Sequence, residues 1–325
     1  MKIGTGFLPR PRPPAGGTIP PAGSATPPGG SATPPGGSAT RLGPRRAARD
    51  ALTLIGIAGA VELFVDTVLR GGGTDQPAYW GYQLSTLYQG STLGGSAARL
   101  YSPAFFQALA PLSSLPYMWF VAVWALIALA ALVWMVGIGP ALGVGVLWVG
   151  VVGEIQGGNI HMLMAAAIVI GFTWPEAWAF VLLTKVLPGL GLLWFPLRGE
   201  WRSFGRALAA TAVVAGVSFV LAPHLWFDWV ELLARQATGG GEAGTSYGPF
   251  SLPVRVLLAA VVLIWGARTD RRWTVPIVAV LASPLLPLAP SMLVACIPLA
   301  RQRGRVAPPR GETVAATAPQ VLNAQ

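Results

Sequence analysis

The sequence predicts an all-α, polytopic membrane protein with about 8 to 10 membrane segments, some of them broken or re-entrant. Apolar residues make up 53% of the 325 residues and charged residues only 10%, whereas a typical soluble domain carries roughly 25% charged residues. The apolar residues fall in blocks of about 15 to 20, the length that crosses the hydrocarbon core of a bilayer. The net charge of +10 comes from arginines clustered between these blocks. That is the positive-inside pattern of membrane proteins, so we expect membrane lipid and no nucleic acid as a partner.

The chain divides into a membrane domain and two tails. Residues 1–47 are rich in Pro, Gly, Ser, Ala and Thr, with a repeat visible in PPAGSAT and PPGGSAT. Such a composition cannot form a core, so we predict a disordered tail. Residues 48–301 form the predicted transmembrane domain, and residues 302–325 form a second disordered tail. The arginines that precede the first apolar block place the N-terminal tail in the cytoplasm.

The first half of the domain is predicted to cross the membrane four times. The block 51–69 runs outward, so the polar stretch 70–102 is expected to be extracytoplasmic. Polar loops this long between membrane helices are usually functional. Prolines break the apolar segment 103–116, which predicts a short interfacial helix. The remaining membrane segments of this half are expected at 117–136, 141–152 and 160–172.

The second half contains a predicted re-entrant hairpin. A single span over 176–197 would place the following arginines outside, against the charge rule, whereas a bend at Pro188-Gly189 returns the chain to the cytoplasmic side. Lys185 then lies next to the bend. Further segments are expected at 207–221, at 252–266 and, as a short pair, within 275–300. This topology predicts a multi-pass protein of the cell membrane with both termini in the cytoplasm.

Few residues are available as metal ligands. Cys296 is the sole cysteine and lies in an apolar run, and His161 and His224 are far apart. The sequence therefore predicts no disulfide, no metal site and no cofactor.

The long loop after the first helix holds the first candidate site. Asp75 is followed by Tyr79, Trp80, Tyr82 and Gln83. Aromatic rings cover the apolar faces of a sugar while a carboxylate accepts hydrogen bonds from its hydroxyls, so this cluster favours carbohydrate chemistry. The alternative is an ordinary hydrated aspartate in a loop.

A second group of polar residues lies in or beside membrane segments. Glu154, Asn159 and His161 gather where one predicted helix ends and the next begins, and they suit either a polar ligand or helix capping and inter-helix hydrogen bonding. Lys185 is a membrane-embedded ammonium group, for which a lipid phosphate is a natural partner. An ion pair with Glu154 or Glu176 is the alternative.

A third cluster follows the 207–221 helix. His224, Asp228 and Glu231 are spaced by four and three residues, which places them on one face of a short helix. Solvation of a polar helix face explains this spacing without a ligand.

The order and spacing of several short motifs resemble glycosyltransferase family 87, the polyprenyl-phosphate-mannose-dependent α-mannosyltransferases of actinobacteria. This family belongs to the C superfamily of membrane glycosyltransferases, so the resemblance implies a GT-C-like fold. It covers about residues 50–235. The motifs are Asp75 with Tyr79 and Tyr82, Tyr101-Ser-Pro103, Leu-Pro116, Gly158-Asn159, Leu-Thr-Lys185-Val-Leu-Pro188, and Arg198-Gly-Glu-Trp-Arg202.

The resemblance implies an inverting, metal-independent transfer of mannose or a similar sugar on the extracytoplasmic face. The donor would be a polyprenyl-phosphate sugar and the acceptor a glycolipid or lipoglycan. Asp75 matches the general base, and Lys185 with His161 would bind the donor phosphate. The substrate-binding residues it implies are Tyr79, Tyr82, Tyr101, Glu154 and Asn159.

Two departures keep other hypotheses open. The family usually has Tyr-Pro-Pro where this chain has Tyr101-Ser-Pro103, and its members usually have more helices at the C-terminal end, so a non-catalytic relative is one alternative. The broken helices at Pro188 and Pro284 also suit a transporter or lipid-handling protein. No internal repeat of the kind common in transporters is visible in the sequence, which counts against that hypothesis.

Overall fold

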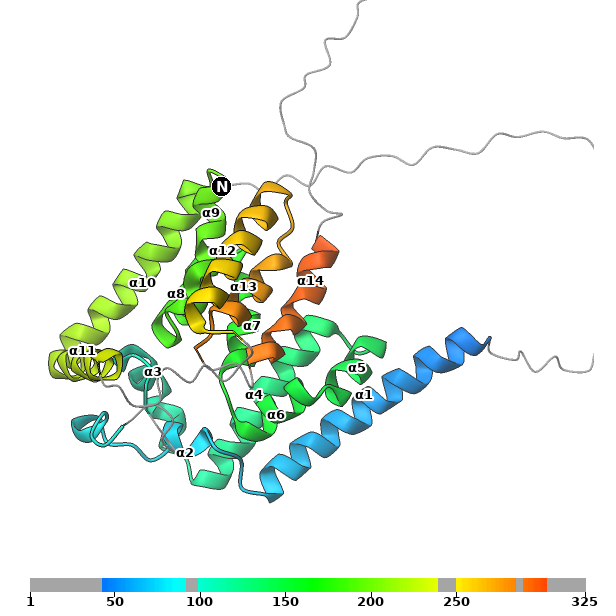
Figure 1. Cartoon of the computed structure of the whole chain (residues 1–325). Coiled ribbons are helices and arrows are strands. Elements are labelled where there is room, and N and C mark those ends of the chain that lie inside the picture. The colour runs from blue at the N-terminus through cyan, green and yellow to red at the C-terminus, as the bar shows by residue number, and fades with distance from the viewer. Residues whose placement is uncertain (1–42, 92–98, 239–249, 285–288, 303–325) are drawn as a thin grey trace, which may run out of the picture. The chain divides into compact units, whose positions relative to one another are not determined.

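The computed structural model describes residues 43–91, 99–238, 250–284 and 289–302. In these ranges every regular element is a helix, as predicted, and no strand occurs (Figure 1). The predicted tails lie outside the described residues except at their inner edges. There the first helix begins at Pro44, four residues before the predicted start of the membrane domain.

The first half of the domain follows the predicted blocks closely, with one break. The predicted 117–136 helix is α4 and the predicted interfacial helix is α3. The predicted 141–152 segment is instead two helices bent by 70° at Trp148, in a stretch whose glycines weaken helical propensity. The elements are α1 (Pro44–Leu69), α2 (Gln76–Tyr79), η1 (Leu84–Thr86), α3 (Pro103–Ser113), α4 (Tyr117–Val136), α5 (Pro140–Leu147), α6 (Val149–Gly157) and α7 (His161–Gly171).

The second half alternates short 3-10 and α-helical pieces with two longer helices. Prolines recur at the broken segments, where they remove backbone donors and interrupt regular helices. The elements are η2 (Pro175–Ala177), α8 (Trp178–Thr184), η3 (Leu187–Leu193), α9 (Trp194–Leu197), α10 (Trp201–Leu221), α11 (Pro223–Thr238), α12 (Leu252–Arg268), α13 (Thr274–Ala282), η4 (Ala289–Ala295) and α14 (Cys296–Arg301).

Among the described residues, three helices are long and apolar enough to cross a membrane, namely α1, α4 and α10. The bent pair α5 and α6 makes a fourth if it counts as one span. Three shorter apolar stretches also occur, at His161–Gly171, Leu187–Leu197 and Ala289–Arg301. The chain is therefore an all-helical membrane protein with broken segments, and the larger number of 8 to 10 spans stays a prediction.

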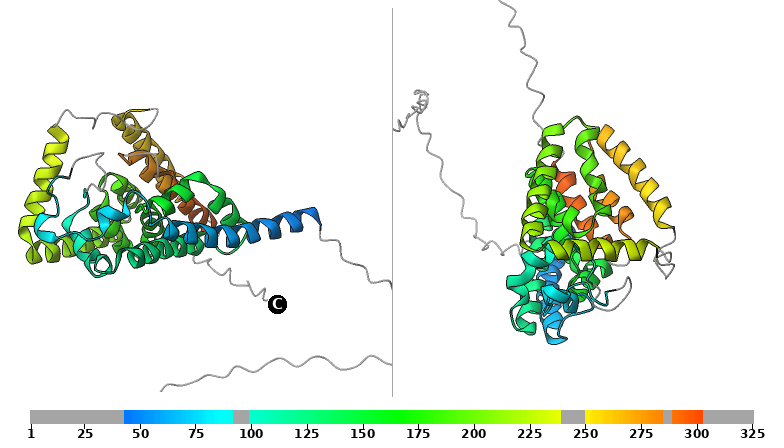
Figure 2. Two further views of the ribbon diagram at one scale, coloured as in Figure 1. Left: turned by 90° about the horizontal axis from the view of Figure 1, so that it is seen from below. Right: turned by 90° about the vertical axis from the view of Figure 1, so that its left-hand side faces the viewer.

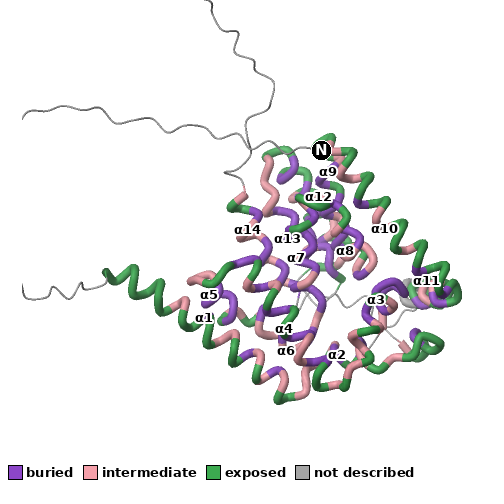
Figure 3. The backbone as a smooth tube through the Cα atoms, turned by 180° about the vertical axis from the view of Figure 1, so that it is seen from behind, coloured by how far each residue is buried: buried purple, intermediate pink, exposed green. Residues whose placement is uncertain are grey.

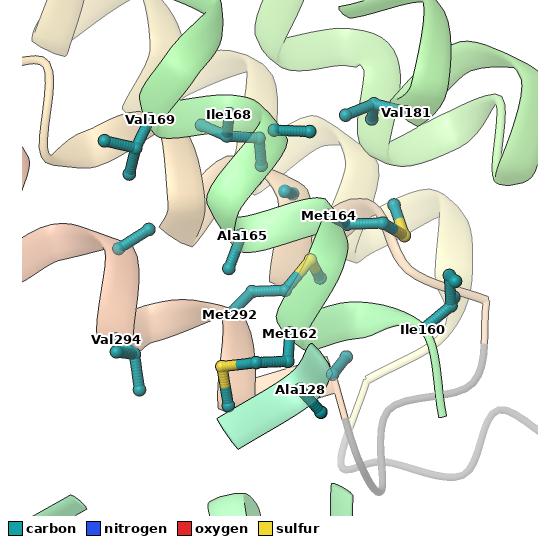
Figure 4. Close-up of a cluster of buried hydrophobic side chains, with 14 of the residues drawn as sticks. Ala128, Ile160, Met162, Met164, Ala165, Ile168, Val169, Val181, Met292 and Val294 are labelled. Carbon is teal, nitrogen blue, oxygen red and sulfur yellow. The ribbon is translucent and has the colours of Figure 1, made fainter. Parts of the chain in front are cut away.

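Helix α7 forms the centre of the packed domain. Its side chains are largely buried, whereas α1 and α10 expose much of their surface (Figure 3). Figure 4 shows Met162, Met164 and Ala165 of α7 beside Met292 and Val294 of η4. Apolar side chains exposed along α1 and α10 are what a helix surface facing lipid requires.

Glycines let α1 pack closely against α5. A Cβ atom added at Gly56 would lie 2.6 Å from the backbone nitrogen of Gly143, and one added at Gly59 would lie 2.9 Å from the side chain of Val146. Small residues at such contacts allow helix backbones to approach each other in membranes. This contact holds α1, and the loop that follows it, against the rest of the domain (Figure 1).

The predicted hairpin is present, with its turn slightly earlier than expected. Helix α8 ends at Thr184, Lys185 adopts an extended conformation, and η3 runs back beside α8. Glu176 at the start of the hairpin pairs with Arg206 at 2.7 Å, just after the point where the hairpin leads into α10. The chain therefore enters and leaves this hairpin at the same end of the domain.

Arginines gather at that same end. Arg198 contacts the carbonyl of Ala267 at 2.9 Å and Asp270 at 3.2 Å, and Arg272 lies 5.3 Å from the ring centroid of Phe172, just after α7. His161, at the opposite end of α7, contacts the Lys185 turn. Since α7 has 11 residues, roughly 16 Å separates the arginine-rich end from the end that holds the candidate site.

Candidate active site

Asp75 lies just before the short helix α2, and its carboxylate is free of the usual capping role. Aspartate at this position normally accepts a hydrogen bond from the second or third residue of the helix. Here Pro77 has no N–H, and the N–H of Ala78 donates to the backbone carbonyl of Asp75 at 3.0 Å. Among the residues that the structure describes, the carboxylate has only a long contact with the hydroxyl of Thr74, at 3.4 Å. It is thus available to a ligand.

The Asp75 carboxyl is partly buried, and charges of both signs, those of Lys185 and Glu154, act on it. Burial raises the pKa of the Asp75 carboxyl above its ordinary value, Lys185 opposes this rise, and Glu154 adds to it. A carboxylate that is partly desolvated binds a proton more tightly, which suits a general base. The same interactions show that Lys185 and Glu154 lie within electrostatic range of Asp75.

The loop that carries Asp75 is fastened to the turn between α6 and α7 (Figure 1). The backbone N–H of Asp75 donates to the carbonyl of Gly157 at 3.0 Å, and the indole of Trp124 donates to the carbonyl of Gly158 at 2.8 Å. Asp66, near the end of α1, accepts from Gln156 at 2.7 Å. Asp75 is therefore held by the backbone of the segment that also carries Glu154.

Glu154, His161 and Lys185 form a connected chain of hydrogen bonds. One carboxylate oxygen of Glu154 accepts from the backbone N–H of Met162 at 2.9 Å, and the other lies 3.2 Å from Nδ1 of His161. Nε2 of His161 lies 2.8 Å from the ammonium nitrogen of Lys185. Glu154 and His161 are fully buried and Lys185 is half-buried. Lys185 therefore stands at the accessible end of this chain.

Two tyrosines connect the lysine to the aspartate loop. The phenol oxygens of Tyr79 and Tyr101 lie 2.9 Å apart, and the ammonium of Lys185 lies 5.8 Å from the centroid of the Tyr101 ring. Burial raises the pKa of both tyrosines above the ordinary value, so both stay protonated near neutral pH. One of the two hydroxyls donates to the other, so one O–H hydrogen of the pair remains for a ligand near Asp75 and Lys185.

Tyr82 and Asn159 lie at the edges of this cluster. Tyr82 donates its hydroxyl to the carbonyl of Phe106. The side-chain oxygen of Asn159 accepts from the N–H of Ile160 at 2.7 Å, next to the start of α7. Neither residue has a described contact with Asp75 or Lys185.

Sequence reasoning named the members of the Glu154, His161 and Lys185 chain separately and missed their order. It also missed Gln76, which is fully buried beside Gly158 and accepts from the N–H of Gly73 at 2.7 Å. The sequence signal that could have indicated the contact of Glu154 with His161 was the Gly157-Gly158-Asn159 turn. A tight turn between two short helices brings the end of one and the start of the next together, and so brings Glu154 near His161.

The described residues thus define an all-helical membrane protein with an acid, a cation and aromatic hydroxyls gathered at one end of its helices. Residues 100–318 match glycosyltransferase family 87, so the chain belongs to this family and is a membrane glycosyltransferase. No curated protein and no solved structure matches the chain. Asp75 and the loop before residue 100 lie outside the matched range.

Proposed function

We propose that this glycosyltransferase moves mannose, or a similar sugar, from a polyprenyl-phosphate donor to a glycolipid or lipoglycan acceptor, with inversion and without a metal ion. The observation that carries the proposal is the contact of Lys185 with the Tyr101 ring and of Tyr101 with Tyr79, four residues after Asp75, with Asp75 within electrostatic range of Lys185. A displacement at the anomeric carbon needs a base on one side of the sugar and a positive charge on the other.

Asp75 acts as the general base. Its carboxylate takes the proton from an acceptor hydroxyl while that oxygen forms a bond to the anomeric carbon. The bond between the anomeric carbon and the phosphate oxygen breaks, and the polyprenyl phosphate leaves with the electron pair. Attack opposite to the leaving group inverts the anomeric configuration.

Lys185 stabilises the phosphate as it leaves. Its ammonium group lies at the turn of the α8–η3 hairpin, where broken helices at membrane depth can line a polar cavity. A positive charge in a partly dry site stabilises the developing negative charge more strongly than it would in water. The Tyr79–Tyr101 pair donates one hydrogen bond to the sugar or to the phosphate, since the other hydroxyl hydrogen joins the two phenols.

His161 and Glu154 act through Lys185 as positioning residues. The ring of His161 is 1% exposed, and both of its nitrogens already have partners. His161 therefore holds the lysine in place behind the phosphate site. Tyr82 and Asn159 contact the acceptor or donor at the rim of the site.

The reaction takes place on the extracytoplasmic face. We place the Asp75 loop on that face because the positive-inside rule favours a cytoplasmic position for the arginines at the far end of α7. A polyprenyl-phosphate donor would reach Lys185 from the bilayer.

The test uses membranes from cells that express the full chain, labelled polyprenyl-phospho-mannose and mixed glycolipid acceptors. We expect transfer by the wild type that persists in excess EDTA, and a loss of about 10² to 10⁴-fold in the Asp75→Asn variant. Asp50→Asn, an equal change at an exposed site at the start of α1, should leave transfer unchanged. Wild-type-like transfer by Asp75→Asn, at equal protein level, would reject Asp75 as the base.

A further inference from the structure

A cavity of about 660 Å³ lies between residues 88–91, just after η1, and helix α11. Ligand pockets in proteins usually measure roughly 300–1,000 Å³, so this volume is sufficient for a small polar molecule. One wall comes from the loop and the other from α11. The lining residues are Tyr88, Gln89, Gly90, Ser91, Asp228, Glu231, Leu232 and Arg235.

The side chains of this cavity suit a neutral polyhydroxyl compound. Asp228 and Glu231 accept hydrogen bonds, Gln89 and Ser91 both donate and accept, and Arg235 donates while pairing with Glu231 at 3.3 Å. Neighbouring hydroxyls of a sugar need donors and acceptors side by side. A lipid phosphate is disfavoured, because the two carboxylates outnumber the single guanidinium.

Both walls of the cavity are hydrogen-bonded to the backbone of Leu100 and Tyr101, next to the candidate active site. The hydroxyl of Tyr88 donates to the carbonyl of Tyr101 at 2.8 Å, and the indole of Trp229, on α11, donates to the carbonyl of Leu100 at 3.1 Å. The phenol of Tyr101 in turn contacts Tyr79 beside Asp75. A chain of contacts thus links the cavity walls to the tyrosine pair near Asp75.

Helix α11 presents three different faces. Leu225 and Leu232 are buried against the domain, whereas Phe227 and Val230 are exposed on a second, apolar face. Asp228 and Glu231 lie on a third face, which lines the cavity. The helix runs across the end of α10 (Figures 1 and 2). This arrangement suits a helix at the membrane surface, with its apolar face in lipid and its polar face toward a water-soluble headgroup.

We propose that this cavity binds the carbohydrate headgroup of the acceptor glycolipid and presents its hydroxyl to Asp75. The inference rests on the proposed function for the nature of the ligand. Asp228, Glu231 and Gln89 then determine which acceptor is used, while Lys185 and His161 serve the donor. Variants in the cavity should therefore affect the acceptor and leave the donor unaffected.

The first experiment measures binding without any donor. The full chain is placed in lipid nanodiscs, free of sugar-based detergent, and saturation-transfer NMR is recorded with octyl glycosides of mannose, glucose, galactose and arabinofuranose. We expect at least one glycoside to bind, and binding at least tenfold weaker in the double variant Asp228→Asn/Glu231→Gln. Asp50→Asn is the matched control and should bind as the wild type does. If the double variant does not fold, Gln89→Ala replaces it, with an expected loss of about threefold.

The second experiment measures transfer with the bound glycoside as acceptor and polyprenyl-phospho-mannose as donor. The cavity variants should raise the KM for the acceptor at least tenfold and leave the KM for the donor unchanged. If no glycoside binds, or if the variants keep wild-type binding and acceptor KM, the cavity proposal is wrong even where transfer occurs. Glycoside binding that depends on Asp228 and Glu231, without any transfer by the wild type, would support the cavity and reject the proposed function.

Discussion

The ammonium nitrogen of Lys185 lies 2.8 Å from Nε2 of His161. An ammonium group only donates hydrogen bonds, so Nε2 must accept and the ring hydrogen must sit on Nδ1. Nδ1 lies 3.2 Å from Oε2 of Glu154, so this hydrogen faces the carboxylate. The buried carboxylate therefore fixes the tautomer of the histidine, and the histidine fixes the direction of the lysine. Two hydrogens of the ammonium group remain for the proposed donor phosphate.

Replacing Lys185 should remove the charge that stabilises the leaving phosphate. Lys185→Met keeps the length of the side chain without its charge, and we expect kcat to fall by about 10² to 10³-fold. Lys185→Arg keeps the charge and should retain more activity than the methionine variant. Steady-state transfer rates with labelled donor provide the measurement. Equal kcat for the wild type and Lys185→Met would contradict the role.

The rate should depend on pH through Asp75. Burial raises the pKa of its carboxyl above the ordinary value, and only the deprotonated form accepts a proton. Activity should therefore be complete above this raised pKa and fall as the pH decreases through it. A profile of kcat/KM from about pH 4 to pH 8 should show a midpoint above roughly 3.9, the value of an unperturbed aspartate. A midpoint at or below that value would count against Asp75 as the base.

Neutralising Glu154 should change both the rate and the pH profile. In Glu154→Gln the side chain has a single acceptor oxygen, which cannot replace both oxygens that Glu154 offers to Met162 N–H and His161 Nδ1–H, so the histidine holds Lys185 less firmly. We expect a loss of about 1.5–3 kcal/mol of transition-state stabilisation, roughly ten- to hundredfold in rate. Because the charge of Glu154 raises the pKa of Asp75, the acid midpoint should also move to lower pH. A lower rate with an unmoved midpoint would indicate a structural role alone.

Gly158 should be more sensitive to substitution than another glycine of similar backbone conformation. It has φ +71° and its added Cβ atom would overlap the buried side chain of Gln76, whereas Gly71 has φ +74° and open space around it. Gly71→Ala should cost about 1–2 kcal/mol, the penalty of left-handed backbone for alanine. Gly158→Ala should add the displacement of Gln76, and so lower the apparent Tm in thermal unfolding by more. Equal decreases in Tm for the two variants would show that the Gln76 contact is unimportant.

Much of the fold was predictable because hydropathy and prolines act locally. The 117–136 block is α4, the proline-bounded 103–116 segment begins with α3, and the charge rule led to the hairpin before Arg198. The break at Trp148 was missed, since the apolar pattern is continuous there and only the glycines around it favour a bend. The family resemblance stated from short motifs is confirmed by the match over residues 100–318.

The candidate site was predictable only as a set of separate residues. Asp75, Glu154, His161 and Lys185 stood out because ionisable groups are rare in this chain. Their sequence positions carry no information on which of them meet. The cavity beside α11 was missed, because His224, Asp228 and Glu231 have the same spacing as any solvated helix face.

The sequence by itself determined that the chain is embedded in a membrane and where most of its helices begin and end, since both follow from the apolar character of neighbouring residues. Only the tertiary structure decided that Glu154 reaches Lys185 through His161, and that Tyr88 and Trp229 attach the two walls of a cavity to the Leu100–Tyr101 segment. Such contacts join residues far apart in the chain. They depend on how glycine turns and broken helices pack together, which local sequence patterns do not specify.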